Sequence, residues 1–152
     1  MSPIGALYVH VPFCAHKCGY CDFTSSAVHG GDSRLVSHAE TMCAQIAELG
    51  ARGLLSGVRT AYVGGGTPTW LGPTSLGSIV RTLRNFCPQV QELTCEANPD
   101  SLTDDMLRTL AAAGATRISV GVQSLRDAEL RELGRIHTAE QARRRVRAAV
   151  RC

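Results

Sequence analysis

Apolar residues gather along this chain in four short runs, which are separated by longer amphipathic segments. The runs cover residues 7–11, 60–63, 92–95 and 116–122. Short apolar or β-branched runs bounded by Gly or Pro are typical of buried strands in a parallel sheet. We therefore expect four parallel strands, the first of which ends at Pro12 because proline has no N–H for the ladder.

Five further segments repeat their apolar residues every three or four positions, as amphipathic helices do. Strands that alternate with helices predict an α/β fold built on a parallel sheet, with a βα unit that recurs about four times. The expected N-caps are Asp32 or Ser33, Thr103 and Thr138, Pro73 opens one helix, and Gly114 and Gly134 end two others. The inward positions are Leu35, Ala39, Met42, Ile46 and Leu49; Leu76, Ile79, Leu83 and Phe86; Met106, Leu107 and Leu110; Leu125, Leu130 and Leu133; Val146, Ala149 and Val150.

Composition is that of an ordinary soluble protein with one core. The chain has 152 residues, 44% of them hydrophobic and 19% charged, with a net charge of +3. This charge is too small to indicate a nucleic-acid partner, and the arginines of the last helix lie opposite an apolar stripe, as on a solvated face. No apolar run is long enough to span a membrane, and residues 1–7 lack a secretion pattern. We expect a cytoplasmic, reducing location.

Three of the seven cysteines lie within eight positions, directly after the first predicted strand. Cys14, Cys18 and Cys21 have the spacing Cys-x-x-x-Cys-x-x-Cys, so their thiolates can surround one centre if the backbone wraps around it. Pro12 and Gly19 favour such a wrap, because proline sets a turn and glycine relieves crowding. The isolated cysteines Cys43, Cys87 and Cys95 are expected to pack in the core.

The number of thiolates narrows the choice of centre. A structural zinc takes four ligands, and no fourth cysteine continues the series, although His10 and His16 lie close. An iron–sulfur cluster usually takes four cysteines, so three leave one iron with an exchangeable position. A disulfide scaffold fits poorly with an odd cysteine count in a reducing compartment. The spacing favours a cluster and keeps a zinc-stapled α/β domain as the alternative.

Other polar residues follow the remaining strands at the point where each strand ends. Residues 64–69 form a glycine turn after the second strand, Glu96 and Asn98 follow the third, and Gln123 follows the fourth. The carboxyl ends of parallel strands meet at one edge of a sheet, so these groups should lie near the cysteines. Backbone groups of a glycine loop can hold a zwitterion, while Glu96 and Gln123 can bond hydroxyls or an ammonium.

Together these motifs resemble the radical S-adenosylmethionine (SAM) superfamily. Within it, the chain is similar to the branch that contains oxygen-independent coproporphyrinogen III oxidases and HemW-type heme chaperones. The similarity covers nearly the whole chain. It is carried by the cysteine spacing with Tyr20 before the last cysteine and by residues 8–14 (YVHVPFC), 64–69 (GGGTPT), 96–99 (EANP), 117–124 (RISVGVQS) and 133–137 (LGRIH).

The resemblance implies a [4Fe-4S] cluster and SAM as cofactors. Its open iron would chelate the amino and carboxylate groups of SAM, and one electron from a donor would split the sulfonium into methionine and a 5′-deoxyadenosyl radical. The residues implied are Cys14, Cys18 and Cys21 as iron ligands, Tyr8 and Tyr20 lining cluster and cofactor, Gly65, Gly66 and Thr67 at the methionine end, and Glu96, Gln123 and Arg135 completing the pocket.

Within this branch, the residues after the third cysteine favour the chaperones. Oxidases tend to place another cysteine two positions later, whereas this chain has Phe23 there. The resemblance therefore implies a protein that carries heme to an acceptor protein, with oxidation of a porphyrinogen as the alternative. By their chemistry alone, His137, then His10 and His16, are candidate heme ligands, although His10 alternates with apolar residues as a hydrogen-bonded core histidine does. The family fold is a partial TIM-type barrel of six βα units, so we interpret residues 1–152 as the truncated N-terminal part of a radical SAM core domain.

Overall fold

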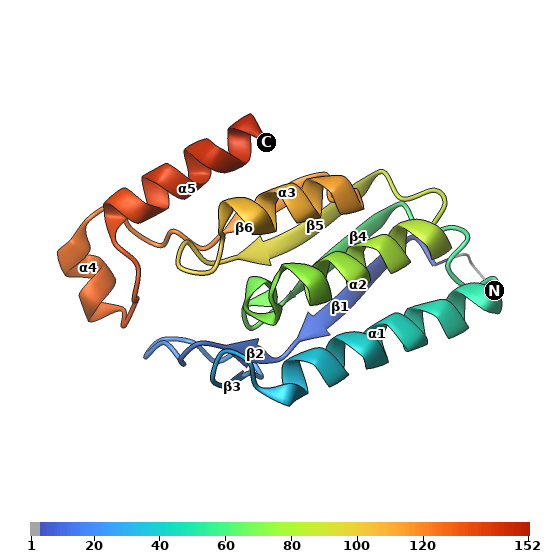
Figure 1. Cartoon of the computed structure of the whole chain (residues 1–152), viewed down its shortest axis with the longest axis horizontal. Helices are drawn as coiled ribbons and strands as arrows, with labels where there is room; N and C mark the ends of the chain where they lie inside the picture. The colour runs from blue at the N-terminus through green and yellow to red at the C-terminus, as the bar shows by residue number, and fades with distance from the viewer. Residues whose placement is uncertain (1–3) are drawn as a thin grey trace.

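The computed structural model describes residues 4–152; residues 1–3, part of the segment read for a secretion signal, lie outside the described residues. Its centre is a four-stranded sheet in which every neighbouring pair is parallel, in the order β1-β4-β5-β6 (Figure 1). The predicted α/β class is confirmed. The strands are β1 (Ala6–Val11), β4 (Thr60–Gly65), β5 (Glu92–Ala97) and β6 (Arg117–Val120).

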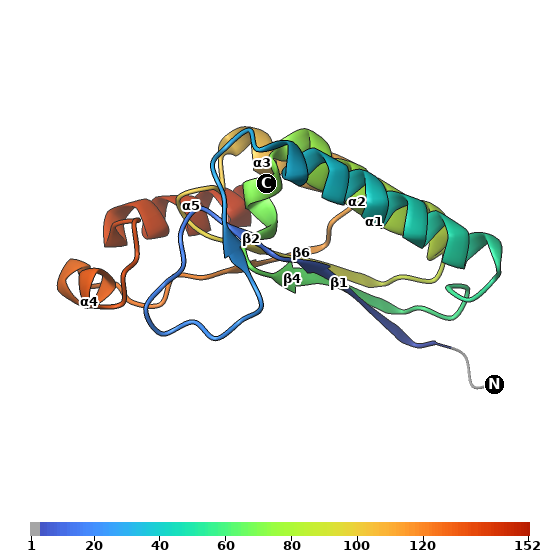
Figure 2. The ribbon, with the colours of Figure 1, turned by 90° about the horizontal axis from the view of Figure 1, so that it is seen from below.

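Three helices cover one face of the sheet, as Figure 2 shows from the side. The other two helices follow β6: α4 lies beyond the carboxyl ends of the strands, and α5 returns to contact α3 (Figure 1). Among residues 4–152, none of the helices is long and apolar enough to cross a membrane. The helices are α1 (Ser33–Ala51), α2 (Pro73–Phe86), α3 (Asp104–Ala113), α4 (Asp127–Glu132) and α5 (Ala139–Arg151), with a 3-10 helix, η1 (Pro68–Leu71), before α2.

The core fills the space between the sheet and α1, α2 and α3. In β1, Val9 and Val11 point into it, as do the expected inward positions of α1, α2 and α3. The expectation is only partly met after β6: Leu130 is buried and Ala149 packs against the core, but Leu125, Val146 and Val150 are exposed. Cys87 and Cys95 are fully buried, and Cys43 packs partly buried against the core, as expected for packing residues. The largest fully buried side chains are Leu55, Leu76, Ile79, Leu83, Leu93, Leu102, Met106, Leu110 and Leu130.

The opposite face of the sheet is polar and aromatic. Alternate positions of the strands bring Tyr8, Tyr62 and Glu96 to this side, and Tyr8 is 55% exposed. No helix formed by residues 4–152 covers it (Figure 2). The expectation of strands buried on both faces is therefore wrong for the described chain, because strand side chains alternate between faces and only one face is packed.

The cysteine loop closes on two short strands that the apolar pattern did not predict. β2 (Phe13–Cys14) pairs in parallel with β3 (Ser26–Ala27), and Val28 N donates to Cys14 O at 3.0 Å. Two-residue strands have no periodicity to detect. The role given to Gly19 is wrong, because a Cβ there would meet no described atom within 4 Å.

Three of the expected helix caps are present. The side chains of Asp32, Thr103 and Thr138 accept from backbone N–H groups in the first turns of α1, α3 and α5. The fourth strand and the following helix are shorter than expected. β6 ends at Val120, and α4 begins at Asp127 and so excludes Leu125, which is 51% exposed.

Candidate functional site

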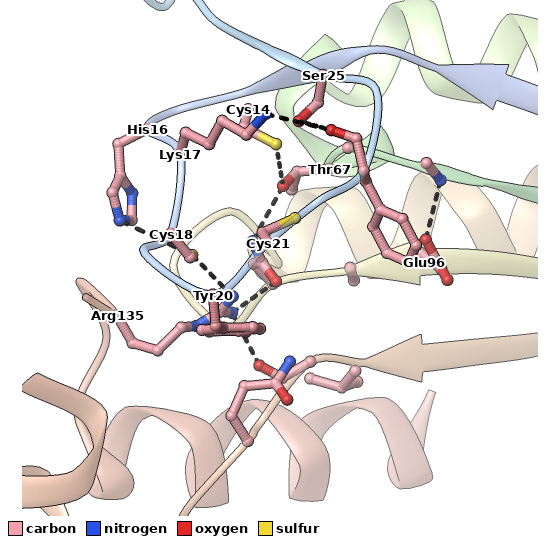
Figure 3. A pocket seen from close by; sticks show the side chains of 18 of the residues that line it. Cys14, His16, Lys17, Cys18, Tyr20, Cys21, Ser25, Thr67, Glu96 and Arg135 are labelled. Carbon is pink, nitrogen blue, oxygen red and sulfur yellow. Dashed lines mark hydrogen bonds between the residues drawn. The ribbon is translucent and has the colours of Figure 1, made fainter. Parts of the chain in front are cut away.

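A pocket of about 500 Å³ lies at the carboxyl edge of the sheet, between the cysteine loop and the ends of β4, β5 and β6 (Figure 3). It brings together every predicted site residue except Tyr8. The predicted residues that line it are Cys14, Cys18, Tyr20, Cys21, Gly65, Gly66, Thr67, Glu96, Gln123 and Arg135. Their further neighbours are His16, Lys17, Phe23, Ser25, Ala97, Asn98, Ser119, Val120, Gly121 and Val122.

The three cysteines share the pocket as free, partly exposed thiols. Thr67 Oγ1 donates to Cys14 Sγ at 3.5 Å, and Arg135 Nη1 donates to Cys18 Sγ at 3.6 Å. Within residues 4–152, no three His, Cys, Asp or Glu side chains stand as a closed metal-ligand set. Three thiols that face one cavity beside two hydrogen-bond donors nevertheless suit a cluster, whose sulfur ligands carry negative charge.

The glycine turn after β4 is fastened through its N–H groups. Gly65 N donates to Glu96 Oε2 at 3.1 Å, Gly66 N to Val11 O at 2.7 Å, and Thr67 N to Phe13 O at 2.7 Å. Because these donors are occupied, the turn can offer a ligand mainly carbonyl oxygens, which accept from an ammonium group.

Close approach explains why glycine is needed in this turn. A Cβ on Gly66 would lie 2.6 Å from Phe13 O, and one on Gly65, whose φ is +118°, would lie 2.6 Å from the ring of His10. A side chain at Gly65 would therefore push against β1, and one at Gly66 against β2, the strand that carries Cys14.

Glu96 joins the glycine turn to the aromatic face below it. Tyr62 Oη donates to Glu96 Oε1 at 2.6 Å, and the Tyr8 ring stacks on that of Tyr62 with their centroids 6.1 Å apart. Burial, and then the Glu96 carboxylate, raises the pKa of both tyrosines. Tyr8 itself lies on the open face of the sheet and does not line the pocket.

Gln123 enters the pocket from an unusual backbone conformation. Its φ is 64°, the left-handed region that side chains rarely adopt. His137 Nε2 bonds to the carbonyl of Val122 at 3.1 Å. This hydrogen bond holds the peptide that joins Val122 to Gln123.

His137 is therefore badly placed to bind heme. His137 is only 3% exposed, and its Nδ1 has no hydrogen-bond partner among residues 4–152. Burial lowers the pKa of the imidazole, so the ring is neutral at neutral pH. The candidates His10 and His16 are also engaged, through Nε2, with the carbonyls of Thr24 and Gly134.

Sequence reasoning missed the part played by Asn98. Its Nδ2 donates to Thr67 Oγ1 at 3.0 Å, and its Oδ1 accepts from Arg135 Nη2 at 2.7 Å. The available signal was its place two residues after Glu96, which puts both at the same strand end.

Comparison with known proteins assigns the fold to a family. The family model described as "Radical SAM superfamily" matches residues 8–152. The chain belongs to the radical SAM superfamily. Its pocket at the strand ends is therefore the pocket of a radical SAM fold, and the family implies a [4Fe-4S] cluster and SAM as cofactors.

Curated relatives in this superfamily include proteins named "Heme chaperone HemW". The chain is 40% identical over 149 residues to that of Mycobacterium tuberculosis strain H37Rv and 36% identical over 151 residues to that of Escherichia coli, covering 93% and 95% of this chain. It is 37% identical over 93% of its length to "Radical S-adenosyl methionine domain-containing protein 1, mitochondrial" of Bos taurus. It spans 37%, 38% and 32% of these relatives, about a third of their length.

A solved structure agrees with this assignment. "Coproporphyrinogen III oxidase (HemN) from Escherichia coli is a Radical SAM enzyme" describes a chain that matches with a TM-score of 0.80 and 26% identity. The match covers 98% of this chain and 35% of that one. The parallel βα architecture is thus that of a radical SAM core with a TIM-like sheet.

Proposed function

We propose that this chain is the cluster- and SAM-binding part of a HemW-type heme chaperone. The observation that carries the proposal is the single pocket in which three free cysteines face the ends of β4, β5 and β6. Similarity to proteins named as heme chaperones, at 31–40% identity, supports the choice within the superfamily.

In this proposal Cys14, Cys18 and Cys21 hold the [4Fe-4S] cluster, which supplies, when bound, the electron that cleaves SAM. Carbonyl oxygens of Gly65 and Gly66 accept from the ammonium group of the methionine end, since the N–H groups of the turn are occupied. In the same proposal, the guanidinium of Arg135 and the amide of Gln123, which both line the pocket, bond carboxylate and ribose oxygens of SAM. Tyr20 lines the pocket beside Cys21 and is 49% exposed.

The cargo in this proposal is heme, which an acceptor protein receives. Position 23 supports the chaperone, because Phe23 lines the pocket where an oxidase-type sequence would place a further cysteine. The odd number of cysteines, seven, fits a reducing compartment such as the cytoplasm better than a disulfide scaffold.

The second candidate is an oxygen-independent coproporphyrinogen III oxidase. The structural match to the E. coli oxidase, at a TM-score of 0.80, favours it. Such an enzyme would bind a porphyrinogen and remove carbon dioxide from its propionates. The two candidates share the cluster and SAM and differ in what happens to the tetrapyrrole: the chaperone passes heme on unchanged, whereas the oxidase removes carbon dioxide from a porphyrinogen.

Two assays on the anaerobically reconstituted chain separate the candidates. A heme chaperone binds heme in a saturable spectrophotometric titration and gives no decarboxylated product with coproporphyrinogen III. Decarboxylation coupled to release of 5′-deoxyadenosine, without stable heme binding, would replace the chaperone by the oxidase. Cys18→Ser serves as the control, because loss of an iron ligand should abolish 5′-deoxyadenosine release and any decarboxylation that depends on it.

A further inference from the structure

Asn98 connects two hydrogen bonds that end on cysteine sulfurs. Its side chain lies between Thr67 Oγ1, at 3.0 Å, and Arg135 Nη2, at 2.7 Å. The Thr67 hydroxyl is 3.5 Å from Cys14 Sγ, and Arg135 Nη1 is 3.6 Å from Cys18 Sγ. An unbroken series of hydrogen bonds therefore runs from one candidate iron ligand to another, as Figure 3 shows at its two ends.

The direction of each bond in this series follows from one group that can only donate. The guanidinium of Arg135 has no acceptor, so the amide of Asn98 must turn its oxygen toward it and its nitrogen toward Thr67. The Thr67 oxygen then accepts from Asn98, and its own proton is left for Cys14 Sγ. Thr67 is 3% exposed, so water does not compete for that proton.

The backbone around Asn98 is built to hold this side chain in place. The carbonyl of Asn98 accepts from Ser101 N at 3.1 Å and Leu102 N at 3.0 Å, which fixes the turn before α3. A Cβ on Gly121 would lie 2.8 Å from Asn98 Oδ1 and 3.5 Å from Arg135 Nη2. Glycine at position 121 therefore leaves the space that the Asn98–Arg135 bond occupies.

We infer that Asn98 is a positioning residue, which aims the Thr67 hydroxyl at Cys14 and the Arg135 guanidinium at Cys18 and so raises the reduction potential of the bound cluster. The inference rests on the proposed function, because it concerns a cluster held by these cysteines. Hydrogen bonds to sulfur ligands favour the more negative, reduced state and are one of the means by which proteins set cluster potentials.

The first test measures the reduction potential of the reconstituted chain by an EPR-monitored redox titration. Asn98→Ala should lower the reduction potential by about 59 mV, which for one electron is a tenfold change in the reduction equilibrium constant. Gly121→Ala should also lower the reduction potential, because the added methyl group displaces the hydrogen bond between Asn98 and Arg135. Asn85→Ala, the same change at an exposed position of α2, should leave it unchanged.

The second test asks whether Asn98 acts through the Thr67 hydroxyl. Thr67→Val should lower the potential in the wild-type chain by a similar factor. It should have no further effect in Asn98→Asp, because a carboxylate accepts on both oxygens and already turns the Thr67 proton away from Cys14. Both chains in this comparison carry Asn98→Asp, so the added negative charge affects both reduction potentials equally.

The outcomes distinguish this inference from the proposed function. A full complement of iron and sulfide in Asn98→Ala with an unchanged potential overturns the positioning role and leaves the proposed function intact. An equal effect of Thr67→Val in both backgrounds also overturns it. A wild-type chain that assembles no iron–sulfur cluster overturns the proposed function, and the inference with it.

Discussion

Gly66→Ala tests whether the glycine turn and the cysteine loop are one mechanical unit. The new Cβ would lie 2.6 Å from Phe13 O and 2.9 Å from Phe13 C and N, all of them backbone atoms of β2. No side-chain rotation relieves such a contact, so β2 must move away by roughly 0.5–1 Å to reach normal packing distances. Phe13 O also accepts from Thr67 N at 2.7 Å, and that hydrogen bond weakens as the strand moves.

The magnitude follows from these two losses. Overpacking costs roughly 1–3 kcal/mol and the weakened hydrogen bond roughly 0.5–1.5 kcal/mol, so the free energy of unfolding should fall by about 2–4 kcal/mol. In urea titrations of the reduced apo chain this lowers the midpoint by about 1–2 M. Gly5→Ala is the matched control, because a Cβ there meets no described atom within 4 Å.

Iron content gives the second reading of Gly66→Ala. Because Cys14 is the last residue of β2, displacement of the strand should reduce the iron bound after reconstitution to less than half of the wild-type value. Unchanged urea midpoint together with full iron would refute the idea that the turn supports the cysteine loop.

Three further predictions concern single side chains. Burial lowers the pKa of His137 below its ordinary 6.5, so its contribution to stability is complete above about pH 6.5 and declines as the pH falls further. In urea titrations between about pH 5 and 7, His137→Gln should flatten that decline by up to about 1.4 kcal/mol per pH unit. An equally steep decline in the variant would contradict this prediction. Glu96→Gln removes the carboxylate that helps to raise the pKa of Tyr62, so tyrosinate absorbance should titrate at lower pH, nearer 10.0; an unchanged titration would rule out the contact. Cys43→Ser should keep full iron, whereas Cys18→Ser should lose most of it; iron loss in both would reject the ligand assignment.

Local chemistry made much of the fold predictable. Pro12 ends β1, and the N-caps Asp32 and Thr103 begin α1 and α3, because each signal acts within a few residues. The open sheet face was not predictable in this way. Tyr8 and His10 have large apolar parts, so their alternation with valines looks like a continuous apolar run, and only the three-dimensional packing distinguishes the two faces.

The site was predictable where topology alone decides, and not where side-chain contacts decide. Parallel strands bring their carboxyl ends to one edge, which is enough to place Glu96, Gln123 and the cysteines around one pocket. The link from Asn98 through Thr67 spans 31 positions of the chain and depends on rotamers that no spacing rule encodes. The occupied N–H groups of the glycine turn are likewise visible only once the neighbouring strands are in place.

The most direct measurement of the central claim is an anaerobic reconstitution followed by iron, sulfide and zinc analysis and EPR of the reduced protein with and without SAM. A cluster on Cys14, Cys18 and Cys21 with one open iron predicts about four irons and four sulfides per chain, and a spectrum that changes when SAM is added. Zinc without acid-labile sulfide, or a complete cluster whose spectrum ignores SAM, would contradict it.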